Sequence, residues 1–183
     1  MFLEFGEIEL ARRVFDKMLE RDVISLNSII TGYLRVGEVE LASQLFEEMP
    51  KRDLVSFNTM IDGYGKCGRC ELAEEVFRMM NEKDVVSCTS MIFAYVINHH
   101  STIADLGFLE GKWVHDYISS NKINLNSGFI ASALVDMYSK CGYIENAYDV
   151  FRMVSHGQKN GDWNSMISSL TIDVKRLSPG LVP

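Results

Sequence analysis

The chain has 183 residues, of which 47% are hydrophobic and 23% are charged, a balance typical of a folded globular protein and not of a disordered one. Its formal net charge of −7 at pH 7 argues against a protein that holds nucleic acid mainly by neutralising phosphates, which requires a basic surface. No apolar run approaches the roughly 20 residues of a transmembrane helix, so we expect a soluble protein without a membrane partner.

The first residues, MFLEFGEIELARRVF, carry acidic side chains early and lack the basic and then apolar segments of a targeting peptide. No transit peptide is therefore visible in this chain. The cysteines are too sparse for a disulfide scaffold and predict reduced thiols without a redox role. They are Cys67, Cys70, Cys88 and Cys141.

The main signal of the sequence is a regular repeat, whose first copy is recognisable from Gly6 onward. A glycine stands at the start of each period, followed five residues later by an alanine, nine later by a phenylalanine and twelve later by a methionine. These sets are Gly6, Ala11, Phe15 and Met18; Gly37, Ala42, Phe46 and Met49; and Gly68, Ala73, Phe77 and Met80. Residues 1–22 thus hold only the second half of a unit.

Two complete units follow without a gap between them. Residues 23–53 and 54–84 agree at 12 of 31 positions, which marks them as copies of one structural unit. In each unit two apolar runs recur at helical spacing on either side of the central glycine. We therefore expect an all-α protein, an α-solenoid of stacked antiparallel helical hairpins with repeats of about 31–35 residues.

The second half of the chain follows the period less regularly. Residues 85–127 predict an irregular hybrid repeat, because the interval from Gly68 to Gly107 is longer than the interval from Gly37 to Gly68. Residues 128–159 predict a further repeat, 160–170 a lone first helix, and 171–183 a disordered tail that matches no repeat.

The blocks VISLNSIITGYLRVGEVELASQLFEEMPKRD and LVSFNTMIDGYGKCGRCELAEEVFRMMNEKD, residues 23–53 and 54–84, closely resemble the short variant of the pentatricopeptide repeat (PPR). Residues 105–118, DLGFLEGKWVHDYI, resemble the second helix of the longer variant that alternates with it in plant PPR proteins of the PLS class. The Trp-x-x-Leu-Gly signature of tetratricopeptide repeats is absent. The resemblance covers about residues 1–170 and implies a truncated or partial protein of that class.

The resemblance implies one RNA base read per repeat, through the fifth residue of the first helix and the last residue of the unit. A carboxamide fits this role because it offers a donor and an acceptor. The implied base-reading residues are Asn27 with Asp53, Asn58 with Asp84, and, in less regular units, Thr89 with Ser127 and Ser132 with Lys159 or Asn160. The implied base-wedging residues, at the second position, are Ile24, Val55, Val86 and Phe129. The plain alternative is that Asn27 and Asn58 cap neighbouring helices or bind water.

The sequence offers little that an enzyme would need. The CxxC at Cys67 and Cys70 lacks a second ligand pair and predicts a turn, and His99, His100 and His115 are expected to be exposed. The HxE and PCxxC motifs of the deaminase domains that end some relatives are absent, as are nucleotide-binding and hydrolase motifs. We expect no catalytic residues, no metal and no cofactor.

The function that the resemblance implies is sequence-specific binding of single-stranded RNA in a mitochondrion or chloroplast, in support of RNA editing or processing. Editing or processing factors would then be supplied in trans. The alternatives are a helical-repeat scaffold for protein interactions and an inactive fragment of a longer repeat protein. The target transcript and the partners are not encoded in any motif of the chain.

Overall fold

The computed structural model describes residues 2–98, 104–125 and 129–155, and all regular structure within these ranges is helical. Contacts divide the chain into two units, Met1–Ala94 and Tyr95–Pro183. None of the helices in the described ranges has the length and apolar character to cross a membrane. The helices are α1 (Phe2–Asp16), α2 (Val23–Val36), α3 (Val39–Glu48), α4 (Leu54–Lys66), α5 (Cys70–Met79), α6 (Val85–Asn98), α7 (Ala104–Ser120), α8 (Phe129–Lys140) and α9 (Ile144–Ser155).

The last residue of each sequence repeat starts the next helix. Asp22 and Asp53 are the N-caps of α2 and α4, and each carboxylate accepts a hydrogen bond from the backbone N–H of a serine three residues on. This bond satisfies one of the backbone donors that a helix N-terminus leaves unpaired. At the other end of α2, Gly37 has φ of 84°, a left-handed conformation that glycine adopts without a Cβ clash. The period in the sequence is therefore a period of helix starts and stops.

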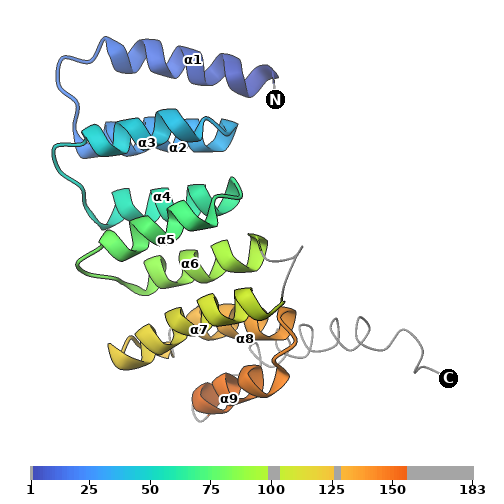
Figure 1. Ribbon diagram of the computed structural model, residues 1–183. Helices are drawn as coiled ribbons and strands as arrows, with labels where there is room; N and C mark the ends of the chain where they lie inside the picture. The colour runs from blue at the N-terminus through green and yellow to red at the C-terminus, as the bar shows by residue number, and fades with distance from the viewer. Residues whose placement is uncertain (1, 99–103, 126–128, 156–183) are drawn as a thin grey trace. The chain divides into compact units, whose positions relative to one another are not determined.

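Helices α2 and α3 form one hairpin, and α4 and α5 form the next (Figure 1). Their inner faces carry the repeated alanine and phenylalanine. Ala42 and Ala73 are completely buried, and so is Phe77, while Phe46 is buried and meets Phe57 edge to face at 5.4 Å. The expected all-α solenoid of stacked hairpins is thus confirmed, with its core at the positions that repeat in the sequence.

Neighbouring hairpins stack closely because small residues face the next hairpin. A Cβ placed on Gly63 would lie 2.3 Å from Leu34 Cδ1, and one on Gly65 would lie 2.7 Å from Ala94 Cβ. The Cys67 thiol donates to the backbone carbonyl of Leu34 at 3.3 Å, another link between α4 and α2. Each hairpin therefore buries its outer apolar face on a neighbour, as repeat proteins require.

In the second unit, α8 packs against both α9 and α7. His115 on α7 corrects the expectation of an exposed histidine, because it is partly buried and its Nδ1 lies 2.7 Å from the Tyr138 hydroxyl. Burial lowers the pKa of His115 and raises the pKa of Tyr138. Both groups are therefore neutral at neutral pH, joined by one hydrogen bond.

Several of the expected segments fall outside the described residues. The lone first helix at 160–170 and the tail at 171–183 lie there, as do His99 and His100 and part of the hybrid repeat at 85–127. The described part of that hybrid repeat holds α6 and α7. The boundaries of the repeats remain predictions.

Candidate nucleic-acid interface

The two asparagine and aspartate pairs that the sequence singled out are neighbours in space. Asn58 Nδ2 donates to Asp84 Oδ1 at 3.4 Å, although the residues are 26 positions apart. Asp84 Oδ1 also accepts from the backbone N–H of Ser87 at 2.8 Å. The Asn27 side chain is likewise close enough to Asp53 to help lower the pKa of that carboxylate. Each amide thus sits on one first helix and contacts the carboxylate that precedes the next.

The carboxylate of Asp53 is held in its charged form. Its pKa is lowered, first by the backbone N–H of Ser56, then by the Ser56 hydroxyl and also by the Asn27 amide. Hydrogen bonds to the ionised form favour that form. At neutral pH the Asp53 carboxylate is therefore negatively charged and lies beside the Asn27 amide.

Fixing the amide nitrogen leaves the amide oxygen without a partner. The Oδ1 atoms of Asn27 and Asn58 are both buried and accept no hydrogen bond from the described residues. A buried acceptor without a donor costs roughly 1–3 kcal/mol. Because the same deficit recurs in both regular repeats, it marks a place where a ligand with an N–H group would be stabilised.

Each base-wedging position predicted from the sequence carries an exposed apolar side chain. Exposed fractions are 75% for Ile24, 59% for Val55, 55% for Val86 and 77% for Phe129. Each stands at the second position of a sequence repeat, three residues before the fifth-position side chain. Large apolar groups at corresponding positions of successive repeats offer surfaces on which bases can stack.

In each of the other two predicted base-reading pairs, the structure describes only the first residue. Thr89 is half-buried on α6, and its hydroxyl donates back to the carbonyl of Val85 at 2.7 Å. Ser132 is exposed on α8. The residues expected to pair with them, Ser127 and Lys159 or Asn160, lie outside the described ranges. The structure thus assembles the two regular pairs and leaves the other two as predictions.

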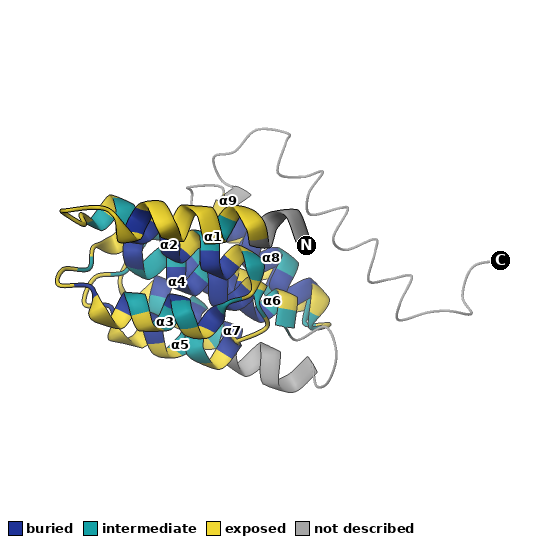
Figure 2. Ribbon diagram, turned by 90° about the horizontal axis from the view of Figure 1, so that it is seen from above, coloured by how far each residue is buried: buried dark blue, intermediate teal, exposed yellow. Residues whose placement is uncertain are grey.

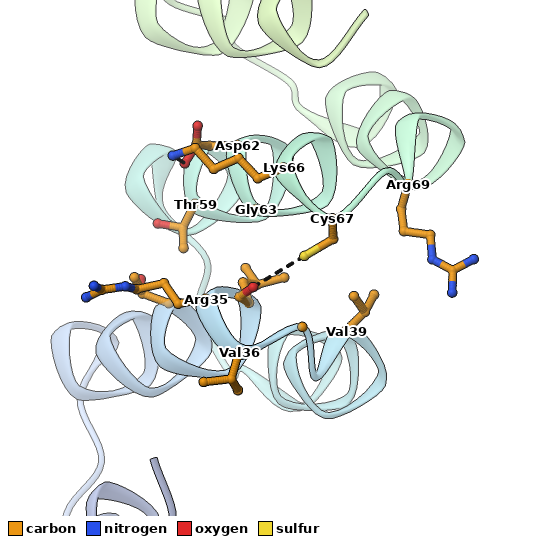
Figure 3. A pocket seen from close by; sticks show the side chains of 12 residues that line it. Arg35, Val36, Val39, Thr59, Asp62, Gly63, Lys66, Cys67 and Arg69 are labelled. Carbon is orange, nitrogen blue, oxygen red and sulfur yellow. Dashed lines mark hydrogen bonds and ion pairs between the residues drawn. The ribbon is translucent and has the colours of Figure 1, made fainter. Parts of the chain in front are cut away.

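A cleft between α2 and α4 was missed by the sequence reasoning (Figure 3). It has a volume of about 910 Å³, and its polar lining includes Arg35, Thr59, Lys66 and Arg69, with Asp62 bound to Lys66 at 2.6 Å. Arg35 and Lys66 occupy the same position in successive repeats, so the period itself carried the signal. With more cations than carboxylates, the cleft suits an anionic ligand.

The thiols in the cleft region are structural. Cys67 ends α4 and Cys70 begins α5, with Gly68 at φ of 75° between them, which agrees with the expected turn. Burial raises the pKa of the Cys67 thiol, so it is protonated at neutral pH and a poor metal ligand or nucleophile. Across the described ranges no three His, Cys, Asp or Glu side chains gather as a metal site would need.

Comparison with known proteins identifies the repeats. The model described as PPR repeat matches residues 55–85 and 129–155, and the model described as PPR repeat family matches residues 21–55. Together the matches cover half of the chain and coincide with the hairpins that carry the asparagine and aspartate pairs. The cleft and the exposed side chains of Ile24, Val55 and Phe129 lie in the same segments, and Val86 follows directly after one of them.

Relatives come from Arabidopsis thaliana and are named pentatricopeptide repeat-containing proteins. One is 51% identical over 73 residues, which is 39% of this chain and 13% of that protein. Another, named as chloroplastic, is 44% identical over 78 residues, 42% of this chain and 17% of that protein. A third, named as mitochondrial, is 34% identical over 169 residues, 91% of this chain and 20% of that protein. The chain therefore spans a fifth or less of the length of these relatives.

Proposed function

Because the chain belongs to the pentatricopeptide repeat family, we propose that it binds single-stranded RNA and selects bases through its asparagine and aspartate pairs. The observation that carries the proposal is the buried, unpartnered Oδ1 of Asn27 and Asn58, each beside an exposed apolar side chain of the same helix. A single pair could serve only to cap the N-terminus of a helix. Two pairs occur at the same position of successive repeats, so they could contact successive bases of one RNA strand.

The chemistry of the pair favours uracil. The carboxylate of Asp84 accepts one N–H of Asn58, and the buried Asn58 atom without a partner is the acceptor Oδ1. The N3–H of uracil and the N1–H of guanine are donors that match it, whereas N3 of cytosine and N1 of adenine are acceptors and would repel it. Between the two matching bases, the family resemblance implies the pyrimidine, uracil. Two adjacent pairs therefore favour two consecutive uridines.

Other side chains of the same repeats would contact the bases and the phosphates of the bound RNA. Ile24 and Val55 would stack between successive bases. Arg35 and Lys66 in the cleft would meet phosphates, although Lys66 shares its charge with Asp62. Since these cations are few and the net charge is −7, affinity would depend on base contacts and only weakly on salt.

In its biological setting, this binding would serve RNA editing or processing in a mitochondrion or chloroplast. The support is the family itself and the names of relatives, one mitochondrial and one chloroplastic. The chemical step would then belong to an editing or processing factor supplied in trans and acting on the bound RNA. The base-reading positions would place that factor on its target.

Homopolymer binding tests the class of ligand. We expect the chain to bind poly-U more tightly than poly-A, poly-C or poly-G in direct titrations. Raising the salt concentration should weaken all four alike, with a shallow slope. Equal and negligible binding to every RNA at low salt would overturn the proposal and favour the scaffold for protein interactions.

Asn58→Thr tests the assignment of a single base-reading residue. The substitution removes the carboxamide and leaves one hydroxyl, so affinity for a site with two uridines should fall by about 1–3 kcal/mol, the worth of one good base contact. Guanine at that one position should then bind better, because the family resemblance implies that threonine with Asp84 retained favours a purine.

Asn81→Thr is the matched control, since Asn81 is exposed in the loop between α5 and α6 and belongs to neither pair. Its RNA affinity should equal that of the unaltered chain. An unchanged base preference in Asn58→Thr, measured with both variants at equal thermal stability, would remove Asn58 from the binding site.

A further inference from the structure

A basic residue directly precedes each aspartate at the end of a repeat, and its side chain lies over a buried phenylalanine ring. Such a cation is attracted by the face of the ring. The same contact occurs in three successive units, so it is a regular part of the repeat. Measured from the cationic carbon or nitrogen to the ring centre, the contacts are Arg21 on Phe15 at 4.5 Å, Arg52 on Phe46 at 4.8 Å and Lys83 on Phe77 at 5.1 Å.

The phenylalanine rings are fixed supports for these cations. Phe46 and Phe77 are buried in the cores of their hairpins. Along α3 and α5, buried and exposed residues alternate (Figure 2), as on helices that cover a core with one face. Arg52 and Lys83 are half-buried there, whereas Lys51, in the same linker as Arg52, is exposed. The two cations are therefore held against the hairpins and differ from an ordinary surface charge.

Hydrogen bonds join the same two cations to the ends of the second helices. Arg52 Nε donates to the carbonyl of Phe46 at 2.9 Å, and Arg52 Nη2 donates to the carbonyl of Glu47 at 2.8 Å. Lys83 Nζ donates to the carbonyl of Met80 at 2.8 Å. The last carbonyls of an α-helix lack partners within the helix, and a positive charge is favoured beside them. Arg52 and Lys83 thus tie the linkers that follow α3 and α5 to the helices themselves.

The next residue of each linker belongs to a base-reading pair. Asp53 follows Arg52 directly, and Asp84 follows Lys83. Each carboxylate accepts a hydrogen bond at 2.8 Å from a serine N–H in the cap of its own helix. That bond fixes the aspartate to the helix that it starts, but the asparagine partner lies on the preceding hairpin. The cation is what joins the aspartate's linker to that preceding hairpin.

The geometry of the pair is sensitive to the position of this linker. Asn58 Nδ2 lies 3.4 Å from Asp84 Oδ1. Most N–H···O hydrogen bonds are roughly 2.7–3.2 Å long, so a further separation of a few tenths of an ångström would end this one. A linker released from the end of α5 would therefore lose the contact between Asp84 and Asn58.

We propose that Arg52 and Lys83 are positioning residues for base selection, and that each holds one aspartate within reach of one asparagine and so governs the selection of one base. Arg52 serves the pair of Asn27 with Asp53, and Lys83 serves the pair in the next repeat. Neither cation has to touch the RNA. The positioning itself is independent of RNA, and only its effect on base selection rests on the proposed function.

Methionine substitutions test the effect on base selection, because methionine removes the charge and the donors but keeps a flexible side chain that packs well on a ring. Titrations compare an RNA with two consecutive uridines with the two RNAs in which cytosine replaces one uridine or the other. Arg52→Met should lower discrimination between uracil and cytosine about fivefold at one of the two positions, the lower end of the range for one base contact. Lys83→Met should have the same effect at the other position. Equal loss at both positions in each variant, or loss at neither when the unaltered chain discriminates at both, would overturn the proposal.

Two matched controls separate positioning from charge. Arg52→Lys keeps a cation that can lie over the ring and cap the helix, as Lys83 does, so discrimination should be retained at both positions. Lys51→Met removes one positive charge from the same linker at an exposed residue, and discrimination should again be unchanged. Loss of discrimination in Lys51→Met would show that the charge of the linker sets the base preference, which contradicts a positioning role for Arg52.

Nuclear magnetic resonance of the chain without RNA tests the positioning by itself. The side-chain amide signals of Asn27 and Asn58 report on the contacts with their aspartates. Arg52→Met should shift the signal of Asn27 and leave that of Asn58 in place, and Lys83→Met should do the reverse. Signals that stay in place in both variants would overturn the positioning role. If the signals move as expected but the unaltered chain discriminates between no bases, the positioning is supported and the proposed function fails.

Discussion

Replacing Phe77 with alanine is expected to lower the free energy of unfolding by about 3–5 kcal/mol, the largest effect anticipated for a single substitution in this chain. The Phe77 side chain is completely buried in the hairpin of α4 and α5. Its removal leaves a cavity whose walls cannot close, because the helices on either side are held by their neighbours. Urea denaturation followed by circular dichroism measures the loss.

Phe93→Ala is the control for this prediction. It deletes the same side chain from the same unit, but Phe93 is 51% exposed, so the cost should be well under half that of Phe77→Ala. RNA affinity should fall alike for all sequences in the Phe77 variant, because the stack loosens without a change at any base-reading residue. Equal destabilisation by both substitutions would contradict the assignment of Phe77 to the core.

Gly65→Ala should destabilise the chain by about 1–3 kcal/mol, the usual cost of overpacking, although alanine is the better helix former. The added Cβ would lie 2.7 Å from Ala94 Cβ and 3.0 Å from Ala94 Cα. A backbone atom cannot move aside as a flexible side chain can, so α4 and α6 would have to separate. Thermal melting monitored by circular dichroism provides the measurement.

Gly6→Ala is the opposite case on α1. A Cβ there would meet no atom within 4 Å, so the intrinsic preference for alanine acts alone and should stabilise α1 by up to about 1 kcal/mol. The two substitutions are chemically identical and should differ in sign. Stabilisation by Gly65→Ala would mean that α4 and α6 are not in close contact at that point.

The sequence was sufficient for the parts of the fold that repeat. The regular spacing of Gly37 and Gly68 predicted the helix ends, because only a residue without a Cβ takes a positive φ readily. The repeated Ala42 and Phe46 positions predicted the hairpin core. Such features are local or periodic, so each copy of the repeat is an independent indication of the same structure.

Part of the candidate site could also be located from the sequence. The pairing of Asn27 with Asp53 and of Asn58 with Asp84 was expected from the family resemblance, and the residues are neighbours in the structure. Their role in reading bases remains a prediction. The sequence positions alone could not show that the amide nitrogen of Asn58 donates a hydrogen bond while its amide oxygen accepts none. That depends on how the side chain is oriented against the next helix.

Tertiary structure alone decided the remaining features. His115 is polar and was expected at the surface, but packing of α7 on α8 buries it against Tyr138. The cleft between α2 and α4 arises where side chains of two neighbouring hairpins do not fill the space between them. The physical reason is that burial depends on which helices pack together: Ala11 and Ala42 stand at the same position of the sequence repeat, yet Ala11 is exposed and Ala42 is completely buried.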